Sequence, residues 1–498
     1  MSDALMLPPE ARLDLWRRLG EAVEGYARGV ETLPVAPQVT SEELRGLLGG
    51  WDFSAPVDWQ EALDFAVDGL SRHQVHTPHP RYYGLFNPAP TTMGIAADAL
   101  AAAFNPQLAA WSHNPFAVEV EQHLVRALGG RFGYDPARCE GCFTSGGAEA
   151  NHTALLVALQ RAFPEVGRRG LQALRSQPVL YVSPQAHHSF QKAARMSGLG
   201  ADAVHEVAVD GRSRMRAESL DARIREDRAA GRAPFLVVAT AGSTGAGVID
   251  PIAPLAEVSE RFGLWLHVDA AWGGAAVLLP ELRQQLAGVE RAGSITFDAH
   301  KWLSVPMGAG LYLTRHPGVL DRTFRVATGY MPPGQASAVD PYAQSMQWSR
   351  RFIGLKLFLS LAVAGWPGYE EAIRHQVAMG DRLRRALTAD GWTVVNDTPL
   401  PLVCFVRDTG EGGVGGVGGA VGAVGAAGAA GAAEAAARLE SIAAAVVASG
   451  QAWISTVHLE AGTALRACIT NHRTGAADVE ALVEALGSAW RKAAIGLP

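Results

Sequence analysis

The sequence is poor in cysteine, in charge of one sign and in long apolar runs, and each shortage excludes a class of protein. Four cysteines in 498 residues are too few for a disulfide framework. Lys and Arg number 43 against 49 Asp and Glu, and the net charge of −6 argues against non-specific nucleic-acid binding, which needs a basic surface. No uninterrupted apolar stretch approaches the roughly 20 residues that a membrane span requires.

The composition is instead that of a globular protein. Hydrophobic residues make up 48% and charged residues 18%, which excludes a disordered chain. The first twenty residues lack the basic-then-apolar layout of a signal peptide. We therefore expect a soluble, cytoplasmic protein with neither nucleic acid nor membrane as a partner, long enough to bury a large core.

Short apolar runs alternate with helical segments through the middle of the chain. The runs at 178–184, 235–240, 264–269 and 294–300 are typical of buried strands, and the segments at 148–163 and 252–263 are typical of helices. Strand and helix alternating in this way indicate βαβ units. The sequence therefore predicts an α/β fold with a mostly parallel central sheet.

Three regions differ in character. Residues 1–75 form an N-terminal helical segment with an amphipathic helix at 11–30, residues 76–368 form the large α/β domain, and residues 369–498 form a small α+β domain. Within the last, residues 410–433 are nearly all Gly, Ala and Val, which predicts an irregular or partly helical insertion. It does not resemble a phosphate loop, because no strand-to-helix transition frames its glycines.

Two groups of potential metal or redox ligands carry little weight. Cys139 and Cys142 form a single CxxC with no second pair and no thioredoxin-like context. His76 and His79 flank a Thr-Pro and cannot share a helical face, so they and His73 are more readily explained as structural or solvated side chains than as metal ligands.

A small-residue turn before the helix at 148–163 is a stronger signal. Gly146, Gly147 and Ala148 present backbone N–H groups at a helix N-terminus, where the helix dipole favours an anion and missing side chains let a phosphate approach. An ordinary helix cap by Ser145 would produce a similar pattern.

Two charged residues follow other predicted strands. Asp269 ends the run at 264–269, at the strand end where open α/β sheets bind ligands, although an Asp there could also cap the next helix. Lys301 follows the run at 294–300, and the 32 residues between them fit one βαβ unit. A lysine at this edge is a poor structural choice, because burying its charge is costly unless it is paired or consumed in an imine.

An anion turn, a carboxylate and a lysine together match the requirements of pyridoxal 5′-phosphate (PLP). The phosphate would take the turn at Gly147, the pyridine nitrogen would take Asp269, and the aldehyde would take Lys301. A carboxylate beside that nitrogen keeps it protonated, so that the ring can accept the electrons released when a bond to Cα breaks.

Four ordered motifs then resemble one family. YVSPQAHHSFQKAAR, VATAGSTGAGVIDP, LWLHVDAAWGG and SITFDAHKW are similar to those of the group II PLP-dependent amino-acid decarboxylases, the family of aromatic-L-amino-acid and glutamate decarboxylases. The resemblance extends from about residue 75 to the C-terminus. It implies an aspartate-aminotransferase-like large domain (fold-type I) and a homodimer in which the N-terminal helices pack across the subunits.

The resemblance also implies roles for further residues. His187 is similar to the histidine that stacks on the cofactor ring and helps to orient the substrate carboxylate, whereas His188 has no implied role. Tyr342 lies where the family has a loop with a catalytic tyrosine; the alternative is a surface tyrosine. The remaining cofactor contacts implied in this way are Thr244, Ala271, Ser294 and His300, with Ser294 and His300 near the phosphate, and Arg466 is implied near the cofactor.

Two departures leave the substrate open. Asp298 stands where many of these enzymes carry Asn, and residues 81–94 match neither the aromatic nor the acidic signature. We expect decarboxylation of an aromatic amino acid to the amine and CO₂. Its apolar pocket could draw on four aromatic side chains that could equally be core: Tyr82, Phe86, Phe104 and Trp111.

Other functions remain open at this point. A glutamate or aspartate decarboxylase is the first alternative, although no arginine stands out as a partner for the substrate side chain. A decarboxylation-coupled aldehyde synthase and an aminotransferase would share the fold and Lys301, but His187 argues against the aminotransferase. A non-catalytic relative would not need Lys301.

Overall fold

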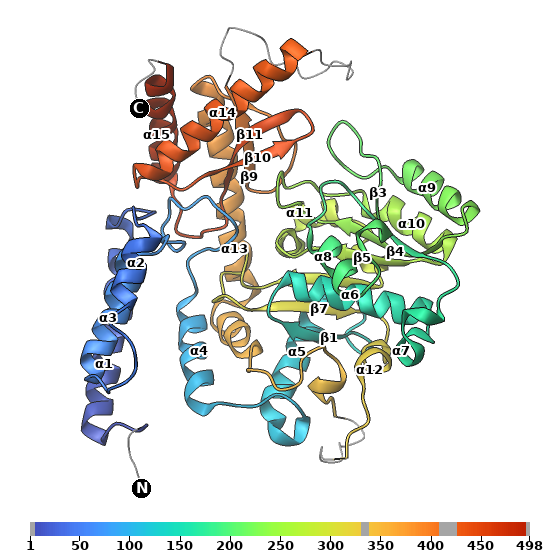
Figure 1. Ribbon diagram of the computed structural model, residues 1–498, viewed down its shortest axis with the longest axis horizontal. Coiled ribbons are helices and arrows are strands. Elements are labelled where there is room, and N and C mark those ends of the chain that lie inside the picture. Colours follow the sequence, from blue (N-terminus) through green and yellow to red (C-terminus); the bar gives the residue numbers. More distant parts are fainter. Residues whose placement is uncertain (1–4, 330–337, 408–425, 495–498) are drawn as a thin grey trace.

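Two sheets organise the chain in the computed structural model, which describes residues 5–329, 338–407 and 426–494 (Figure 1). The larger sheet has the order β1-β7-β6-β5-β4-β2-β3. Its strands are β1 (Glu140–Thr144), β2 (Pro178–Val182), β3 (Val204–Glu206), β4 (Ala233–Thr240), β5 (Trp265–Asp269), β6 (Ser294–Asp298) and β7 (Gly310–Thr314). Strands β3, β2, β4, β5 and β6 pair in parallel, whereas β7 is antiparallel to both β6 and β1.

Apolar side chains on both faces explain why these segments form a buried sheet. In β2, Val179 and Tyr181 belong to one hydrophobic core and Leu180 and Val182 to another. Because successive side chains of a strand point to opposite faces, a strand buried on both sides must be apolar throughout. The short apolar runs in the sequence are therefore the interior strands of a two-sided sheet.

Helices cover both faces of this sheet. Against one face lie α6 (Gly147–Ala162), α8 (Ser189–Met196) and α12 (Val319–Phe324), next to α7 (Val166–Arg169). Against the other lie α5 (Pro115–Arg131), α9 (Ala217–Ala229), α10 (Ile252–Phe262) and α11 (Pro280–Arg283). The α/β fold class and the mostly parallel sheet predicted from the sequence are confirmed.

The second sheet is antiparallel and belongs to the C-terminal part. Its order is β10-β11-β9-β8, from β8 (Thr393–Val394), β9 (Leu402–Val406), β10 (Ser455–Leu459) and β11 (Gly462–Cys468). Helices α14 (Ala426–Ala448) and α15 (Ala476–Ala494) pack on it. The long helix α13 (Gly354–Ala389) connects the two parts and is interrupted at Gly365, whose φ is +62°, just before Pro367. The predicted boundary at 368/369 lies beside this kink.

Four further helices stand at one side of the molecule in Figure 1. They are α1 (Pro9–Gly29), α2 (Ser41–Leu48), α3 (Trp59–Arg72) and α4 (Thr92–Phe104), of which α4 packs on α13. The amphipathic pattern predicted the helix α1, but none of its residues is buried. Leu13 is 72% exposed and Trp16 is 58% exposed. Within the described chain, no helix is both long enough and apolar enough to cross a membrane.

The sequence patterns did not specify the structure of two connecting segments, the β5–β6 crossover and the Gly/Ala/Val insertion. The crossover from β5 to β6 is a series of short helical turns, because Pro280 begins one turn and Gly288, at φ +96°, directly precedes another. In the Gly/Ala/Val insertion, residues 410–425 lie outside the described residues, and residues 426–433 belong to α14.

Candidate active site

The carboxyl edge of the large sheet brings most of the predicted site residues together. At the start of α6, the backbone N–H of Gly147 donates to Asp298 Oδ2 at 3.0 Å. A Cβ on Gly147 would lie 2.9 Å from that oxygen and 3.2 Å from the Cβ of Ala271, so the turn has no room for a side chain. Ala148, in the first turn of α6, is exposed.

Ser145 does not cap this helix. The N-cap is Gly146, with no side-chain hydrogen bond, and both the N–H and the hydroxyl of Ser145 donate to Glu149 Oε2, at 2.8 and 2.7 Å. The explanation by a Ser145 cap is therefore wrong: the first N–H of the helix, that of Gly147, is bonded by the Asp298 carboxylate instead, and a helix N-terminus favours a negative group.

Asp269 ends β5 with both carboxylate oxygens bonded. Its Oδ1 accepts from the N–H of Ala271 at 3.1 Å, and its Oδ2 accepts from Asn151 Nδ2 at 2.8 Å. The Asp is nearly buried, and these two donors fix its orientation. It does not cap a following helix, because the next residues form an irregular turn.

Lys301 lies three residues after the end of β6. Its Nζ is 3.0 Å from Asp298 Oδ2 and 5.8 Å from the centroid of the Phe86 ring. The side chain keeps 22% of its surface exposed, so the amine is paired yet accessible. Asp298 therefore serves two donors through one oxygen, while its Oδ1 is buried without a partner among the described residues.

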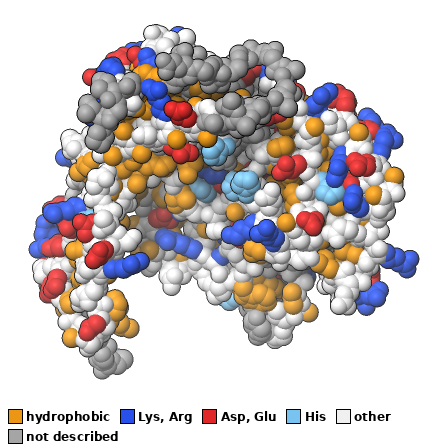
Figure 2. Space-filling view, turned by 45° about the horizontal axis from the view of Figure 1, so that its top comes forward, with side chains coloured by type: hydrophobic (Ala, Val, Ile, Leu, Met, Phe, Trp, Pro, Cys, Tyr) orange, Lys and Arg blue, Asp and Glu red, His pale blue; other side chains and the backbone are white. Residues whose placement is uncertain are grey.

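Two histidines flank this group. His187 is exposed, yet partial desolvation lowers the pKa of its ring, with Asp269 raising that pKa and Lys301 lowering it. His300 is buried, which lowers its pKa, and its Nδ1 accepts from the N–H of Ala309 at 3.1 Å. Its ring approaches Gly146: a Cβ there would lie 3.4 Å from it. Histidine side chains gather near the middle of one face, beside a hollow in the surface (Figure 2).

Arg466 reaches the site from β11 of the C-terminal sheet. Its Nε donates to the carbonyl oxygen of Thr244 and its Nη1 to that of Gly84, both at 3.0 Å. The guanidinium carbon is 5.0 Å from the centroid of Phe86, which also stacks on Trp272 at 4.6 Å. Arg466 is only 2% exposed, and its Nη2 has no partner among the described residues.

The structure does not bring two predicted residues into this group. Ser294 starts β6, at the end of the strand opposite to Asp298, and its hydroxyl bonds Trp265 and His267 instead of facing the anion turn. Tyr342 lies in a one-turn 3-10 helix, where its N–H donates to Ala109 O and its ring packs on Trp348 at 5.0 Å between centroids.

The four aromatic residues considered for a substrate pocket are dispersed. Phe86 lies beside Lys301, and Tyr82 packs on Trp453. Trp111 bonds Glu119, and Phe104 is exposed at the end of α4. Asn151, which holds Asp269, was missed from the sequence, although a polar residue on an otherwise apolar helix face was the available signal.

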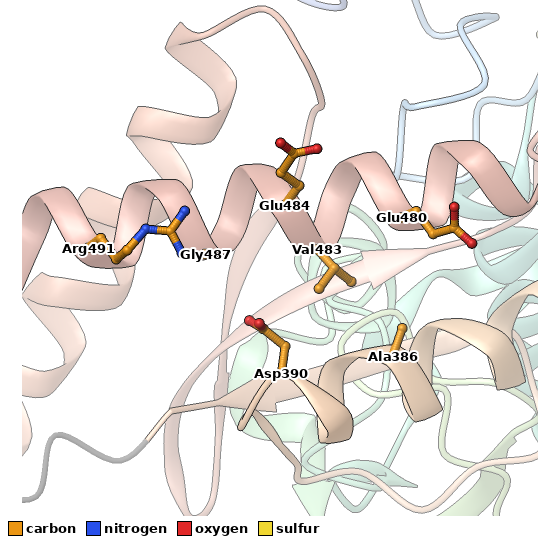
Figure 3. Close-up of a pocket in the computed structure, with 7 residues that line it drawn as sticks. All are labelled: Ala386, Asp390, Glu480, Val483, Glu484, Gly487 and Arg491. Atoms are coloured by element: carbon orange, nitrogen blue, oxygen red, sulfur yellow. The ribbon is translucent and has the colours of Figure 1, made fainter.

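A separate surface pocket of about 340 Å³ lies between α13 and α15 (Figure 3). Two of its charged groups have partners of their own: Glu480 pairs with Arg382, and Asp390 accepts from Arg407 at 3.3 Å. We assign no function to it.

The donor set at the sheet edge fits PLP. A phosphate needs a helix start with small residues, and α6 starts with Gly147 and Ala148, of which Ala148 is exposed while the N–H of Gly147 is bonded to Asp298 Oδ2. A pyridine nitrogen needs a fixed carboxylate, which Asp269 supplies, and the aldehyde needs an accessible amine, which Lys301 supplies.

The comparisons with known proteins identify the family. The pyridoxal-dependent decarboxylase conserved domain matches residues 55–407, and the chain belongs to this family. It is therefore a PLP-dependent amino-acid decarboxylase, a carboxy-lyase.

Individual relatives differ in the substrates that their names give. The chain is 31% identical to an aromatic-L-amino-acid decarboxylase of Bacillus atrophaeus, over 81% of this chain and 83% of that protein. It is 30% identical to the acidic amino acid decarboxylase GADL1 of Bos taurus, over 67% of this chain and 64% of that protein. The crystal structure of mouse CSAD in apo form is similar over 97% of this chain and 99% of that one, with a TM-score of 0.87 and 26% identity.

Proposed function

We propose that this enzyme decarboxylates an aromatic L-amino acid to the corresponding amine and CO₂. The observation that supports the proposal is the apolar, aromatic surroundings of the lysine: Phe86, 4% exposed, lies 5.8 Å from Lys301 Nζ and stacks on Trp272, 2% exposed. A stacked pair of rings next to the reacting amine favours an aromatic substrate side chain over a charged one. The aromatic relative also matches more of the chain than the acidic one does.

The same proposal assigns roles to the residues at the sheet edge. PLP, when bound, supplies an electron sink for the bond that breaks at Cα. Lys301 would bind its aldehyde carbon, Asp269 would keep its ring nitrogen protonated, and His187 would stack on its ring and orient the substrate carboxylate. Other contacts to the cofactor would come from Gly147, Ala148, Thr244, Ala271 and His300.

An acidic amino acid is the second candidate, because Arg466 has a donor to spare. Its Nη2 is buried without a partner among the described residues, and a substrate carboxylate would satisfy it. Under this alternative, Arg466→Lys should raise KM for glutamate or aspartate by more than tenfold while the enzyme still binds PLP, since lysine keeps the charge but cannot bond both backbone carbonyl oxygens and a substrate carboxylate as the planar guanidinium can.

The test is CO₂ release measured across the twenty amino acids, with Lys301→Ala as the control for background. DOPA is tested in addition to the twenty amino acids. The proposal expects the highest kcat/KM with tyrosine, tryptophan, phenylalanine or DOPA. A maximum with glutamate or aspartate would support the second candidate instead. Amine, aldehyde and keto acid are quantified in the same samples, so that an aldehyde synthase or an aminotransferase is recognised by its product.

We also propose that the enzyme is a homodimer. Helix α1 presents Leu13 and Trp16 to solvent and has no buried residue of its own in the single chain. An exposed apolar stripe on an amphipathic helix is typical of a surface that binds another protein chain. A second copy of this chain is the partner that the family resemblance implies.

A further inference from the structure

A chain of buried polar groups continues from Asp269 into the large sheet. Asn151 is 1% exposed, and His267 and Ser294 are 0% exposed. Asn151 Nδ2 lies 2.8 Å from Asp269 Oδ2, and Asn151 Oδ1 lies 3.2 Å from His267 Nε2. His267 Nδ1 lies 2.8 Å from Ser294 Oγ, which in turn lies 2.9 Å from Trp265 Nε1. The chain thus joins α6, β5 and β6 behind the carboxylate.

The chemistry of its two ends fixes the direction of every bond in this chain. The indole N–H of Trp265 can only donate, so Ser294 Oγ accepts there; when the proton of a neutral His267 is on Nε2, the unprotonated Nδ1 accepts the Ser294 hydroxyl proton. From Nε2 the ring proton of His267 is donated to Asn151 Oδ1. At the other end, the ionised carboxylate of Asp269 can only accept, which orients the amide of Asn151.

This direction requires a neutral imidazole, and burial provides one. Burial lowers the pKa of His267 to about 4, so the ring carries a single proton near neutral pH. Thr296 Oγ1, 3.2 Å from His267 Nε2, is a second acceptor for that proton. Phe190 and Tyr312 flank the ring and present no charge to it.

Asn151 also reaches the second proposed cofactor contact. Its Nδ2 lies 2.9 Å from Ser189 Oγ, and the N–H of Ser189 donates to His187 Nδ1 at 3.2 Å. One buried amide therefore ties Asp269 to the turn that carries His187. A buried polar group that served packing alone would need only to satisfy its own hydrogen bonds.

We propose that Asn151 is the positioning residue of Asp269, and that the hydrogen bonds from Trp265 through Ser294, His267 and Asn151 fix this carboxylate where it keeps the cofactor's ring nitrogen protonated. A hydrogen bond donated to a carboxylate stabilises its charged form. Successive bonds that point the same way strengthen one another in a dry interior. The inference rests on the proposed role of Asp269.

The experiment measures the ring nitrogen directly. Wild type, Asn151→Ala and Asp269→Asn are reconstituted with PLP labelled with ¹⁵N in the ring, and the ¹⁵N chemical shift and the dissociation constant of PLP are recorded. In Asn151→Ala we expect the dissociation constant to rise about tenfold, as for loss of one hydrogen bond to a charged group. The ¹⁵N shift should move towards the value of an unprotonated pyridine.

A matched control separates positioning from packing. Asn471 is also 1% exposed and donates to the carbonyl oxygens of Pro78 and His79. None of these residues takes part in the hydrogen bonds behind Asp269. Asn471→Ala should lower the free energy of unfolding without moving the ¹⁵N shift. If Asn151→Ala does not fold, Ser294→Ala removes a more distant link and should shift the signal in the same direction by a smaller amount.

The outcomes distinguish the two proposals. A changed ¹⁵N shift in Asp269→Asn but an unchanged shift in both Asn151→Ala and Ser294→Ala would overturn the positioning role and leave that of Asp269 standing. An unchanged shift in Asp269→Asn would remove Asp269 from the ring nitrogen and the inference with it. If the ¹⁵N shift changes as much in Asn471→Ala as in Asn151→Ala, the change reflects a general loosening of the protein, and the positioning role of Asn151 is overturned.

Discussion

Position 147 has no room for a side chain. A Cβ on Gly147 would lie 2.9 Å from Asp298 Oδ2, and this contact forces the carboxylate, and with it Lys301, to move. We therefore expect Gly147→Ala to weaken PLP binding at least about tenfold and to lower the free energy of unfolding by about 1–3 kcal/mol.

The measurement for Gly147→Ala is a PLP titration followed by absorbance, together with urea unfolding. Gly211→Ala is the matched control, because a Cβ there meets nothing within 4 Å. Equal PLP affinity in Gly147→Ala and wild type would contradict the assignment of this turn to the phosphate.

The role of Tyr342 stays a prediction, and its packing makes the test a clean one. The ring packs on Trp348 and the backbone is anchored on Ala109, so Tyr342→Phe removes the hydroxyl and leaves these contacts in place. If the hydroxyl supplies the proton to Cα, the variant should keep CO₂ release but divert product from amine towards aldehyde. Amine, aldehyde and hydrogen peroxide are quantified together under air; an unchanged amine yield removes Tyr342 from the reaction.

Individual residues were predictable from the sequence where a strand end identified them. Asp269 and Lys301 follow apolar strands, and the sheet brings such ends to one edge. Ser294 was misplaced because its role was carried over from the family resemblance, although it begins the predicted run at 294–300, at the end opposite to Lys301. Asn151 was missed because its partners, Asp269 and His267, are more than a hundred residues away.

At the scale of elements, β5 carries a titratable group that the unfolded chain exposes. Burial lowers the pKa of His267 from 6.5 to about 4. Between these values the unfolded state holds the extra proton, so the free energy of unfolding falls as the pH falls. A pKa shift of this size corresponds to a loss of about 3 kcal/mol in the free energy of unfolding once the pH is below both pKa values.

We expect His267→Gln to remove this component of the acid sensitivity. The test compares the unfolding free energies of wild type and variant at each pH, because Asp250 has the opposite effect on the pH dependence. Burial raises the pKa of Asp250 from 3.8 to about 6, so between these pH values the folded state holds the extra proton. Urea unfolding between pH 4.5 and 7 gives the two curves. Curves that stay parallel over this range would show that His267 titrates alike in both states.

The elements were predictable to different degrees. Interior strands such as β4 and β5 are apolar on both faces and bounded by turn residues, so the sequence predicts them nearly to their ends. The antiparallel direction of β7 was not predictable, since it depends on its pairing with both β1 and β6. The crossover at 273–291 formed short turns because Pro280 and Gly288 interrupt it.

At the scale of the whole molecule, the exposed stripe on α1 predicts an assembly. Leu13→Glu combined with Trp16→Glu should shift the mass in solution from twice that of the chain to that of one chain, because charge on this stripe opposes burial. Sedimentation velocity measures the mass. Glu21→Gln, on the same helix, is the control and should leave the dimer intact; a double variant that remains dimeric would place the interface elsewhere.

The position of Arg466 has a consequence for how the enzyme matures. This side chain is supplied by the last strand of the chain, yet it bonds the carbonyl oxygens of Gly84 and Thr244, hundreds of residues earlier. During synthesis, all strands of the large sheet have been made once β7 has left the ribosome. Arg466 is added only later, with β11. The surroundings of Lys301 are therefore complete only after β11 has been translated and has packed against the large sheet.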